Sequence, residues 1–414
     1  MTQVTRLHYH LGRMNGRDPA QSHRSATPLE LLYDLTLVVA FGTAGSQFAH
    51  ALAAGHIGVA LAGFQFAMFG AIWAWINFSW FASAYDTDDW YMRLAVLVQM
   101  AGVVILALGI PDVFHGLEDG WQVHNEVMVL GYVVMRIAVV ALWLRAARSD
   151  PTRRKTCLTY AIGIAVAQLG WIVMSALHLS FLLTLPAMLL LLVFEMCIPY
   201  FAETRHSPTP WHPHHIAERY GLLTIIALGE GVIGTTSALE ALIAIQGWGR
   251  DAAIMLAAGL SLTFACWWIY FNFPFGDLLA KRRDHGFLFG YSHLILYTAI
   301  AAIGAGLHVA AYAFQGETVL GPVGIALSVA LPTGVFILTT YILAPLIKMA
   351  PLSGFYLKVL SATLLPLVGA VILAASGAGL SWALILIMLS PWLTVIAFEV
   401  VGHREAVASS GAVQ

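Results

Sequence analysis

Twelve runs of mostly apolar residues make up most of this sequence, and they restrict what it can fold into. About 20 residues of α-helix cross a bilayer core that is about 30 Å thick. Of the residues, 59% are hydrophobic and 10% are charged, whereas a soluble domain carries about 25% charged residues. The sequence therefore predicts an all-α integral membrane protein with twelve transmembrane helices. The predicted spans lie near residues 29–53, 57–84, 92–112, 124–147, 155–178, 182–203, 215–241, 250–274, 286–312, 320–347, 353–376 and 380–401.

The basic residues predict how these spans are oriented. Cytoplasmic loops of membrane proteins are enriched in Lys and Arg. If the N-terminus is inside, all of the 20 basic residues except Arg136 and Arg250 lie in the tails or at cytoplasmic connections. We therefore expect both termini in the cytoplasm, as tails over residues 1–28 and 402–414. The first tail has no apolar stretch typical of a signal peptide, so the first span is expected to direct insertion.

A weak internal similarity suggests that the chain is duplicated. Residues 73–78 (Trp-Ala-Trp-Ile-Asn-Phe) resemble residues 268–273 (Trp-Ile-Tyr-Phe-Asn-Phe), and the same offset pairs Asp89 with Asp284. Repeated half-bundles are typical of transporters, and an even number of spans per half makes the repeats parallel. We predict two six-helix halves, 29–203 and 215–401, joined by a cytoplasmic linker over 204–214.

Two acidic residues begin the first span. Thr27 and Glu30 match a capping box with Pro28 at the first helical position, which explains Glu30 without a functional role. Asp34 lies one turn deeper on the same face, where an unpaired carboxylate is unfavourable. We expect Asp34 either to line a polar cavity or to have a structural partner.

Arg136 lies near the middle of the fourth span and needs a carboxylate partner or contact with water. Glu230 in the seventh span is the predicted partner, because the two residues lie at similar depths, about 16 and 21 Å from the cytoplasmic ends of their helices. Glu195, Glu399 and His293 are expected to add to this network. The pair either fixes helix packing or forms a substrate or proton site.

The second span ends at an acidic turn, Asp86-Thr87-Asp88-Asp89. The carboxylates in such a group repel one another unless a cation, a basic neighbour or a shared proton reduces the repulsion. It is either a solvated loop, a site for a divalent cation such as Mg²⁺ beside a phosphate, or a proton-donating motif similar to that of class II terpene cyclases.

The linker before the seventh span carries His212, His214 and His215, followed by Glu218 and Arg219. Histidines and a glutamate can bind a transition metal, but exposed histidines are common in loops, and we predict no metal site. Glu218 and Arg219 begin the seventh span much as Glu30 begins the first. The net charge of −2 and the absence of a basic face make nucleic acid an unexpected partner.

Three stretches together resemble the bacterial low temperature requirement protein A (LtrA) family. They are Thr27 to Leu35, the acidic turn, and the run from His215 to Glu230. Family members usually have Phe-Phe-Asp where this chain has Leu32-Tyr33-Asp34. The resemblance covers residues from about 25 to about 400 and implies a multi-pass protein of the bacterial inner (plasma) membrane. It implies no particular reaction, substrate or cofactor.

Two functional hypotheses follow, and the sequence does not decide between enzyme and non-enzyme. The first is a small-solute or ion-coupled transporter with a polar site inside the membrane. The second is a membrane enzyme, for example a cyclase or transferase, that acts on a lipid or isoprenoid diphosphate. A third interpretation is that the charges only lock helices together. The sequence does not define an oligomeric state. The candidate substrate-binding residues are Glu30, Arg136, Glu195, Glu218, Arg219, Glu230 and His293, and the candidate catalytic residues of an enzyme are Asp34, Asp86, Asp88 and Asp89.

Overall fold

The computed structural model describes residues 11–19, 21, 24–349 and 354–402, and the regular secondary structure in this part of the chain is helical apart from one isolated bridge between Gln122 and Ser180. Twelve stretches are long and apolar enough to cross a membrane, which confirms the predicted number. The third span is broken at Gly109 into α3 and α4. The elements are α1 (Pro28–Ala53), α2 (Ile57–Tyr85), α3 (Trp90–Leu108), α4 (Ile110–Glu118), α5 (Glu126–Ser149), α6 (Arg154–Ala176), α7 (Phe181–Arg205), α8 (Pro213–Gln246), α9 (Arg250–Phe271), α10 (Phe275–Lys281), η1 (Arg283–His285), α11 (Gly286–Gln315), α12 (Pro322–Lys348), α13 (Gly354–Ala375), α14 (Leu380–Ala397) and η2 (Phe398–Gly402).

The start of α1 shows how local sequence determines a helix end. The Thr27 amide donates to Glu30 Oε2 at 2.8 Å, and the Glu30 amide donates to Thr27 Oγ1 at 3.2 Å. These two bonds satisfy backbone donors that the first turn of a helix leaves free. The predicted capping box is confirmed.

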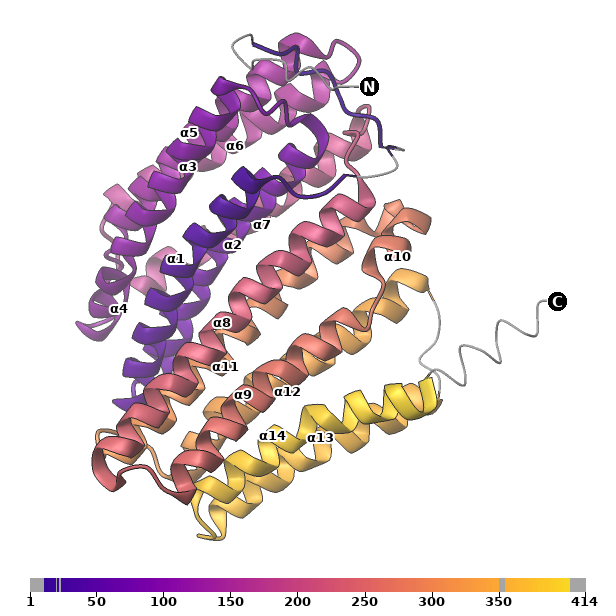
Figure 1. Ribbon diagram of the computed structural model, residues 1–414. Coiled ribbons are helices and arrows are strands. Elements are labelled where there is room, and N and C mark those ends of the chain that lie inside the picture. The colour runs from indigo at the N-terminus through magenta and orange to yellow at the C-terminus, as the bar shows by residue number, and fades with distance from the viewer. Residues whose placement is uncertain (1–10, 20, 22–23, 350–353, 403–414) are drawn as a thin grey trace, which may run out of the picture. The chain divides into compact units, whose positions relative to one another are not determined.

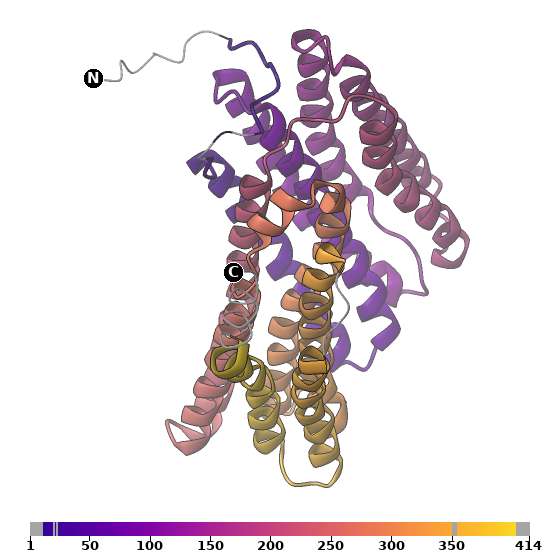
Figure 2. The same ribbon diagram turned by 90° about the vertical axis from the view of Figure 1, so that its right-hand side faces the viewer.

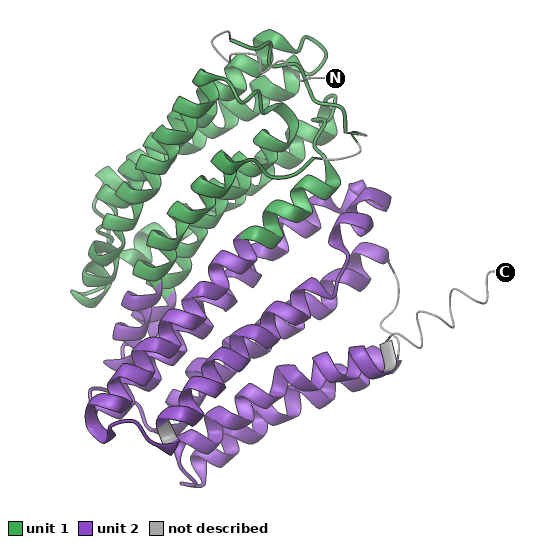
Figure 3. Cartoon of the chain, viewed as in Figure 1, with its two compact units in different colours: residues 1–44, 62–222 green, residues 45–61, 223–414 purple. Residues whose placement is uncertain are grey.

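The chain divides into two compact units, which Figure 3 shows in different colours. Unit 1 comprises residues 1–44 and 62–222, and unit 2 comprises residues 45–61 and 223–414. This division differs from the predicted halves, because α1, α2 and α8 each contribute to both units. The six-plus-six repeat itself stays a prediction.

In unit 1, α3, α5, α6 and α7 pack in chain order, each against the next, and α3 and α5 lie side by side in Figure 1. Two glycines allow the closest approach. A Cβ atom on Gly102 would lie 2.8 Å from the Gly131 carbonyl oxygen, and one on Gly131 would lie 2.6 Å from that of Gly102. Small residues at such crossings let membrane helices pack backbone to backbone.

In unit 2, α11 packs against α12, α12 against α13, and α13 against α14, which also packs against α9. Figures 1 and 2 show α13 and α14 as a pair of adjacent antiparallel helices. Helices α8 and α11 also cross closely, since a Cβ atom on Gly304 would lie 2.6 Å from the Glu230 carbonyl oxygen.

Large apolar side chains cover the outside of the helices in both units. Leu182 and Leu190 on α7 are 75% and 71% exposed, and Leu365 on α13 is 67% exposed. Exposed apolar surface on this scale is unfavourable in water and favourable against lipid chains. The surface therefore supports a bilayer as the surroundings of this protein.

Candidate functional site

The first group of buried charges in unit 1 centres on Arg219 of α8. Its Nη2 atom lies 2.6 Å from Asp34 Oδ1, its Nε atom donates to Asp34 Oδ2 at 3.3 Å, and its Nη1 atom lies 2.8 Å from Glu30 Oε1. Trp75 donates to Asp34 at 2.6 Å, and His215 Nε2 lies 3.4 Å from Glu30. We call these five residues the Arg219 cluster. One guanidinium is thus shared by two carboxylates.

Helical periodicity explains how two helices form this cluster. Glu30 and Asp34 lie one turn apart on α1, and His215 and Arg219 lie one turn apart on α8, so each pair shares a face. All four side chains are at most 2% exposed. A charge buried to this degree is stable only with an opposite charge and hydrogen bonds, and the planar guanidinium supplies both.

The second group centres on Glu195 of α7. Arg136 Nη2 lies 2.8 Å from Glu195 Oε2, which also accepts from Trp73 at 2.6 Å and from Tyr132 at 2.7 Å. Trp171 donates to the other carboxylate oxygen at 2.8 Å. We call these five residues the Arg136 cluster. All are at most 6% exposed.

The predicted partner of Arg136 was wrong. The sequence analysis chose Glu230, but the carboxylate that pairs with Arg136 is Glu195. The prediction compared only depths along the helices, and depth does not define which helices are neighbours. Glu195 itself was expected near Arg136, and this expectation is confirmed.

Helix α2 joins the two clusters, because Trp73 donates to Glu195 and Trp75 donates to Asp34. Side chains two residues apart point to roughly opposite sides of a helix. Tyr33 is fully buried within electrostatic range of both arginines. Its hydroxyl has no hydrogen-bond partner in the described part of the chain.

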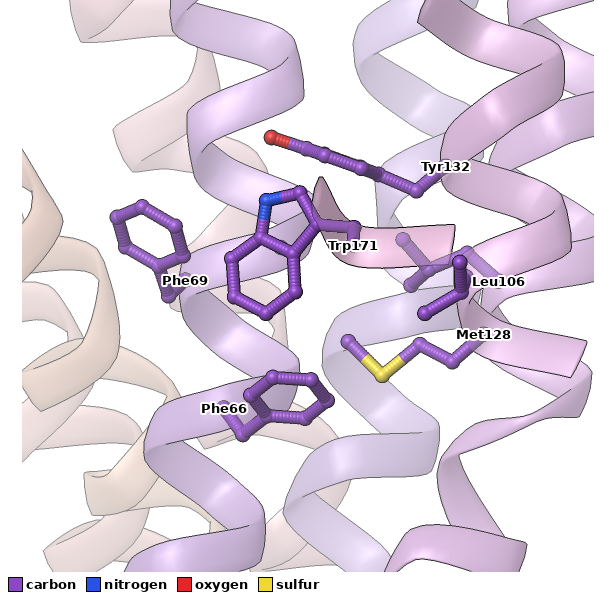
Figure 4. A pocket seen from close by; sticks show the side chains of 8 residues that line it. Phe66, Phe69, Leu106, Met128, Tyr132 and Trp171 are labelled. Atoms are coloured by element: carbon purple, nitrogen blue, oxygen red, sulfur yellow. The ribbon is translucent and has the colours of Figure 1, made fainter. Parts of the chain in front are cut away.

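An apolar cavity adjoins the Arg136 cluster (Figure 4). Tyr132 and Trp171 line it, and in Figure 4 their polar atoms point to the same side of the cavity. Both donate to Glu195, so the cavity and the cluster share two side chains. The remaining lining residues are Phe66, Phe69, Gly70, Leu106, Met128 and Val129.

The predicted site residues of unit 2 have different surroundings. His293 on α11 contacts the Tyr270 hydroxyl at 2.9 Å and the Phe289 carbonyl at 2.7 Å. Glu399 accepts from Trp268 at 3.2 Å. Glu230 is 5% exposed, and no ion pair or hydrogen bond of its side chain is found among the described residues.

The three acids of the acidic turn have separate partners. Asp89 caps α3 by accepting from the Met92 amide at 3.0 Å, and it forms an ion pair with Arg145. Asp88 pairs with Arg93 at 3.0 Å on the surface. Asp86 accepts from the Asp88 amide at 2.9 Å, and burial raises the pKa of its carboxyl. Among the described residues, no three His, Cys, Asp or Glu side chains are grouped to hold a metal ion.

The N-terminal segment is hydrogen-bonded to the end of α2. Arg24 donates to the carbonyls of Ala82, at 2.6 Å, and Ser83, and the Arg17 amide donates to the Ala84 carbonyl at 3.0 Å. The last carbonyls of a helix lack hydrogen-bond partners within the helix, and this segment supplies the donors for them. Burial lowers the pKa of Arg24 to about 10, so it stays charged at neutral pH.

A second attachment holds the segment through Arg145, which donates to the Gly12 carbonyl at 2.8 Å and to Asp89. The Gly12 amide donates to Asp89 at 3.1 Å. Burial acts to raise the pKa of Asp89, but the hydrogen bonds led by Arg145 outweigh it and lower the pKa to about 2. The carboxylate is therefore ionised whenever the pH is near neutral.

We expect Arg145→Ala to release the N-terminal segment. The variant loses charge-assisted bonds worth about 1.5–3 kcal/mol, so local opening and tryptic cleavage after Arg17 should become about tenfold faster or more. Because the folded-state pKa of Asp89 is depressed, its contribution is complete above about pH 4 and is lost only as the pH falls toward 2. The protection of the wild-type chain against tryptic cleavage after Arg17 should thus be constant from pH 6 to about 8. Arg93→Ala, which removes the exposed pair with Asp88, is the matched control and should leave cleavage unchanged.

The remaining predictions concern the start of α8. Arg219 and Glu218 were expected together at the start of the seventh span, but Arg219 is buried in its cluster, whereas Glu218 is exposed. The linker histidines are not all exposed, since His212 and His215 are buried. The sequence analysis did not identify Trp73, Trp75, Trp171 and Tyr132 as members of these clusters. Their N–H and O–H groups are the donors that buried carboxylates need.

These features define a class of protein, namely a polytopic helical membrane protein with charge clusters buried between its spans. A sequence model of the bacterial low temperature requirement A protein (LtrA) family matches residues 25–391, and the chain belongs to this family. It is also 24% identical over 293 residues, which are 66% of this chain and 67% of the relative, to "Uncharacterized protein RA0937" of Rhizobium meliloti (strain 1021). No solved structure matches the chain.

Proposed function

We propose that the chain is a carrier of small organic solutes with a carboxylate or similar anionic group. The observation that carries the proposal is Arg136, whose Nε and Nη1 atoms are buried without hydrogen-bond partners in the described residues. Buried N–H groups are nearly always satisfied, and guanidinium binds carboxylates through two parallel bonds. The free edge of this guanidinium therefore suits an anionic ligand.

The adjoining cavity supports an apolar or aromatic portion in the same solute. Its walls are aromatic and aliphatic, which is the lining typical of small-molecule sites. Tyr132 and Trp171 belong to both the cavity and the cluster, so a solute that contacts them would also affect their hydrogen bonds to Glu195. A bound anion would compete with Glu195 for Arg136 and so change the contact between α5 and α7.

The Arg219 cluster suits a gate in this carrier. It joins α1 to α8 through ion pairs, which are directional and can be broken and reformed. We place this end of unit 1, together with both termini, on the cytoplasmic side of a bacterial inner membrane, as the basic residues favour.

One correspondence supports the predicted six-plus-six repeat. Trp73 in the second span donates to Glu195 in the sixth at 2.6 Å, and Trp268 in the eighth span donates to Glu399 at the end of the twelfth at 3.2 Å. Each predicted half thus has an indole from its second span bonded to a glutamate of its last. Parallel repeats of this kind occur in transporters.

The test compares cells that express the wild-type chain, Arg136→Lys or the surface control Arg93→Lys to equal levels. All are incubated with a defined mixture of small carboxylic and amino acids, and cells and medium are analysed by mass spectrometry. We expect at least one acid to redistribute unchanged with wild type and Arg93→Lys but not with Arg136→Lys, since ammonium cannot reproduce the guanidinium geometry. A fourth strain expresses Asp88→Asn/Asp89→Asn, and a new covalent product that is absent from this strain alone would instead support the isoprenoid or lipid enzyme hypothesis. Equal distributions in the first three strains would reject the proposal for these acids.

A further inference from the structure

Glu230 is a carboxyl group buried in the middle of a membrane-spanning helix, and the described residues provide no ion-pair partner for it. It has about 25 Å of α8 on either side and is 5% exposed. Glu195, by contrast, has one cation and three neutral donors within 2.8 Å. The chain therefore contains two buried glutamates with opposite surroundings.

The elements that pack against Glu230 within unit 2 supply no counter-charge. Helix α11 crosses α8 beside Glu230, at Gly304. The titratable groups of α11 are Tyr291, His293, Tyr297, His308 and Tyr312. The titratable groups of α9 that the structure describes are Arg250, Cys266 and Tyr270, and the other titratable group of α8 in this unit is Glu240. No ion pair or hydrogen bond joins any of these groups to the Glu230 carboxyl in the described part of the chain.

The nearby hydroxyl groups do not supply donors either. Thr235 donates to the Gly231 carbonyl at 2.6 Å, and Thr263 donates to the Gly259 carbonyl at 3.1 Å. Both hydroxyls are thus occupied by the backbone of their own helix. An ionised carboxylate at Glu230 would therefore receive no hydrogen bond from these hydroxyls.

We propose that Glu230 is a proton-binding site. A lone carboxylate in a low-dielectric interior becomes neutral by binding a proton. A metal cation is a poor alternative ligand, because Na⁺ or Mg²⁺ needs several oxygen atoms and no such group surrounds Glu230 among the residues described. Proton binding stands without the carrier proposal; only its use as the coupling step of transport rests on that proposed function.

The site can exchange its proton only when water reaches it. Helices α8 and α11 approach closely at Gly304, where a Cβ atom would lie 2.6 Å from the Glu230 carbonyl oxygen, so a shift between these helices would change the surroundings of the carboxyl. The proton would then be released to the side on which water enters. Glu230 thus has the features of a proton carrier inside the bilayer.

The first test is chemical and needs no transport. N,N′-dicyclohexylcarbodiimide reacts with protonated carboxyl groups in apolar surroundings: the carboxyl proton moves to a carbodiimide nitrogen, and the carboxylate oxygen attacks the central carbon. Purified full-length protein in liposomes is treated at pH 7 and digested, and the peptides are analysed by mass spectrometry. We expect an adduct at Glu230 that weakens as the pH rises, and none at Glu195 in the same sample.

The second test covers the case in which the reagent does not reach α8. Infrared spectra of wild type and Glu230→Gln at pH 7 are compared for the C=O stretching band of a protonated carboxyl group, which should be lost in the variant. Gln is close in shape to a protonated Glu, so Glu230→Gln should leave Tm within error of wild type, whereas Glu195→Gln should lower it clearly. If no band is lost and Glu230→Gln lowers Tm as much as Glu195→Gln, Glu230 is ionised and paired, and the proposal is wrong.

Discussion

Arg219→Met should abolish the stable fold of this protein. The substitution leaves Glu30 and Asp34 buried without their shared cation, and breaking a buried ion pair in this way costs about 3–5 kcal/mol. That loss is comparable to the whole stability of many domains. We expect little monodisperse protein in size-exclusion chromatography after detergent extraction, and a strongly lowered Tm for what remains.

The triple variant Glu30→Gln/Asp34→Asn/Arg219→Met separates charge from packing. It has no buried charge at this position, so most of the lost stability should return even though all three side chains differ from wild type. The matched control is Arg282→Met, because Arg282 pairs with Asp284 at 2.8 Å but both are partly exposed. Such a surface pair contributes at most about 1 kcal/mol. If the triple variant is as unstable as the single one, the cluster stabilises by shape rather than by charge pairing.

Local features of this protein could be predicted from the sequence. Each membrane helix satisfies its own backbone hydrogen bonds, so hydropathy alone locates the twelve spans. The Thr27–Glu30 capping box and the shared face of Glu30 and Asp34 also follow from positions a few residues apart. These are the predictions that the structure confirms.

Contacts between distant helices could not be predicted in the same way. Depth along a span admits several carboxylates as partners of Arg136, and only the packing of α5 against its neighbours selects Glu195. Aromatic residues in membrane proteins are expected at the interfaces, yet Trp73 and Trp75 are buried as hydrogen-bond donors. The acidic turn looks like one site in sequence, but Asp89 binds Arg145, which lies 56 residues away.

The Arg136 cluster allows a structural ion pair to be distinguished from a binding site. Arg136→Met alone leaves Glu195 with three neutral donors and no cation, and Glu195→Met alone leaves a buried guanidinium without a carboxylate. Each single change should therefore destabilise the protein by about 3–5 kcal/mol. The double variant Arg136→Met/Glu195→Met contains no unpaired charge, so its Tm should return to within a few degrees of wild type.

The double variant should regain the stable fold but should not regain the redistribution of solute. The double variant keeps an apolar cavity and loses the only cation of the cluster, so we expect a well-folded protein that moves none of the acids carried by wild type. A structural lock would behave differently, because apolar packing would replace the ion pair and activity would recover with stability. Measuring Tm and solute redistribution on the same three variants thus separates the two roles: recovery of both would show that Arg136 and Glu195 only hold α5 against α7, and recovery of Tm alone would show that the guanidinium binds the solute.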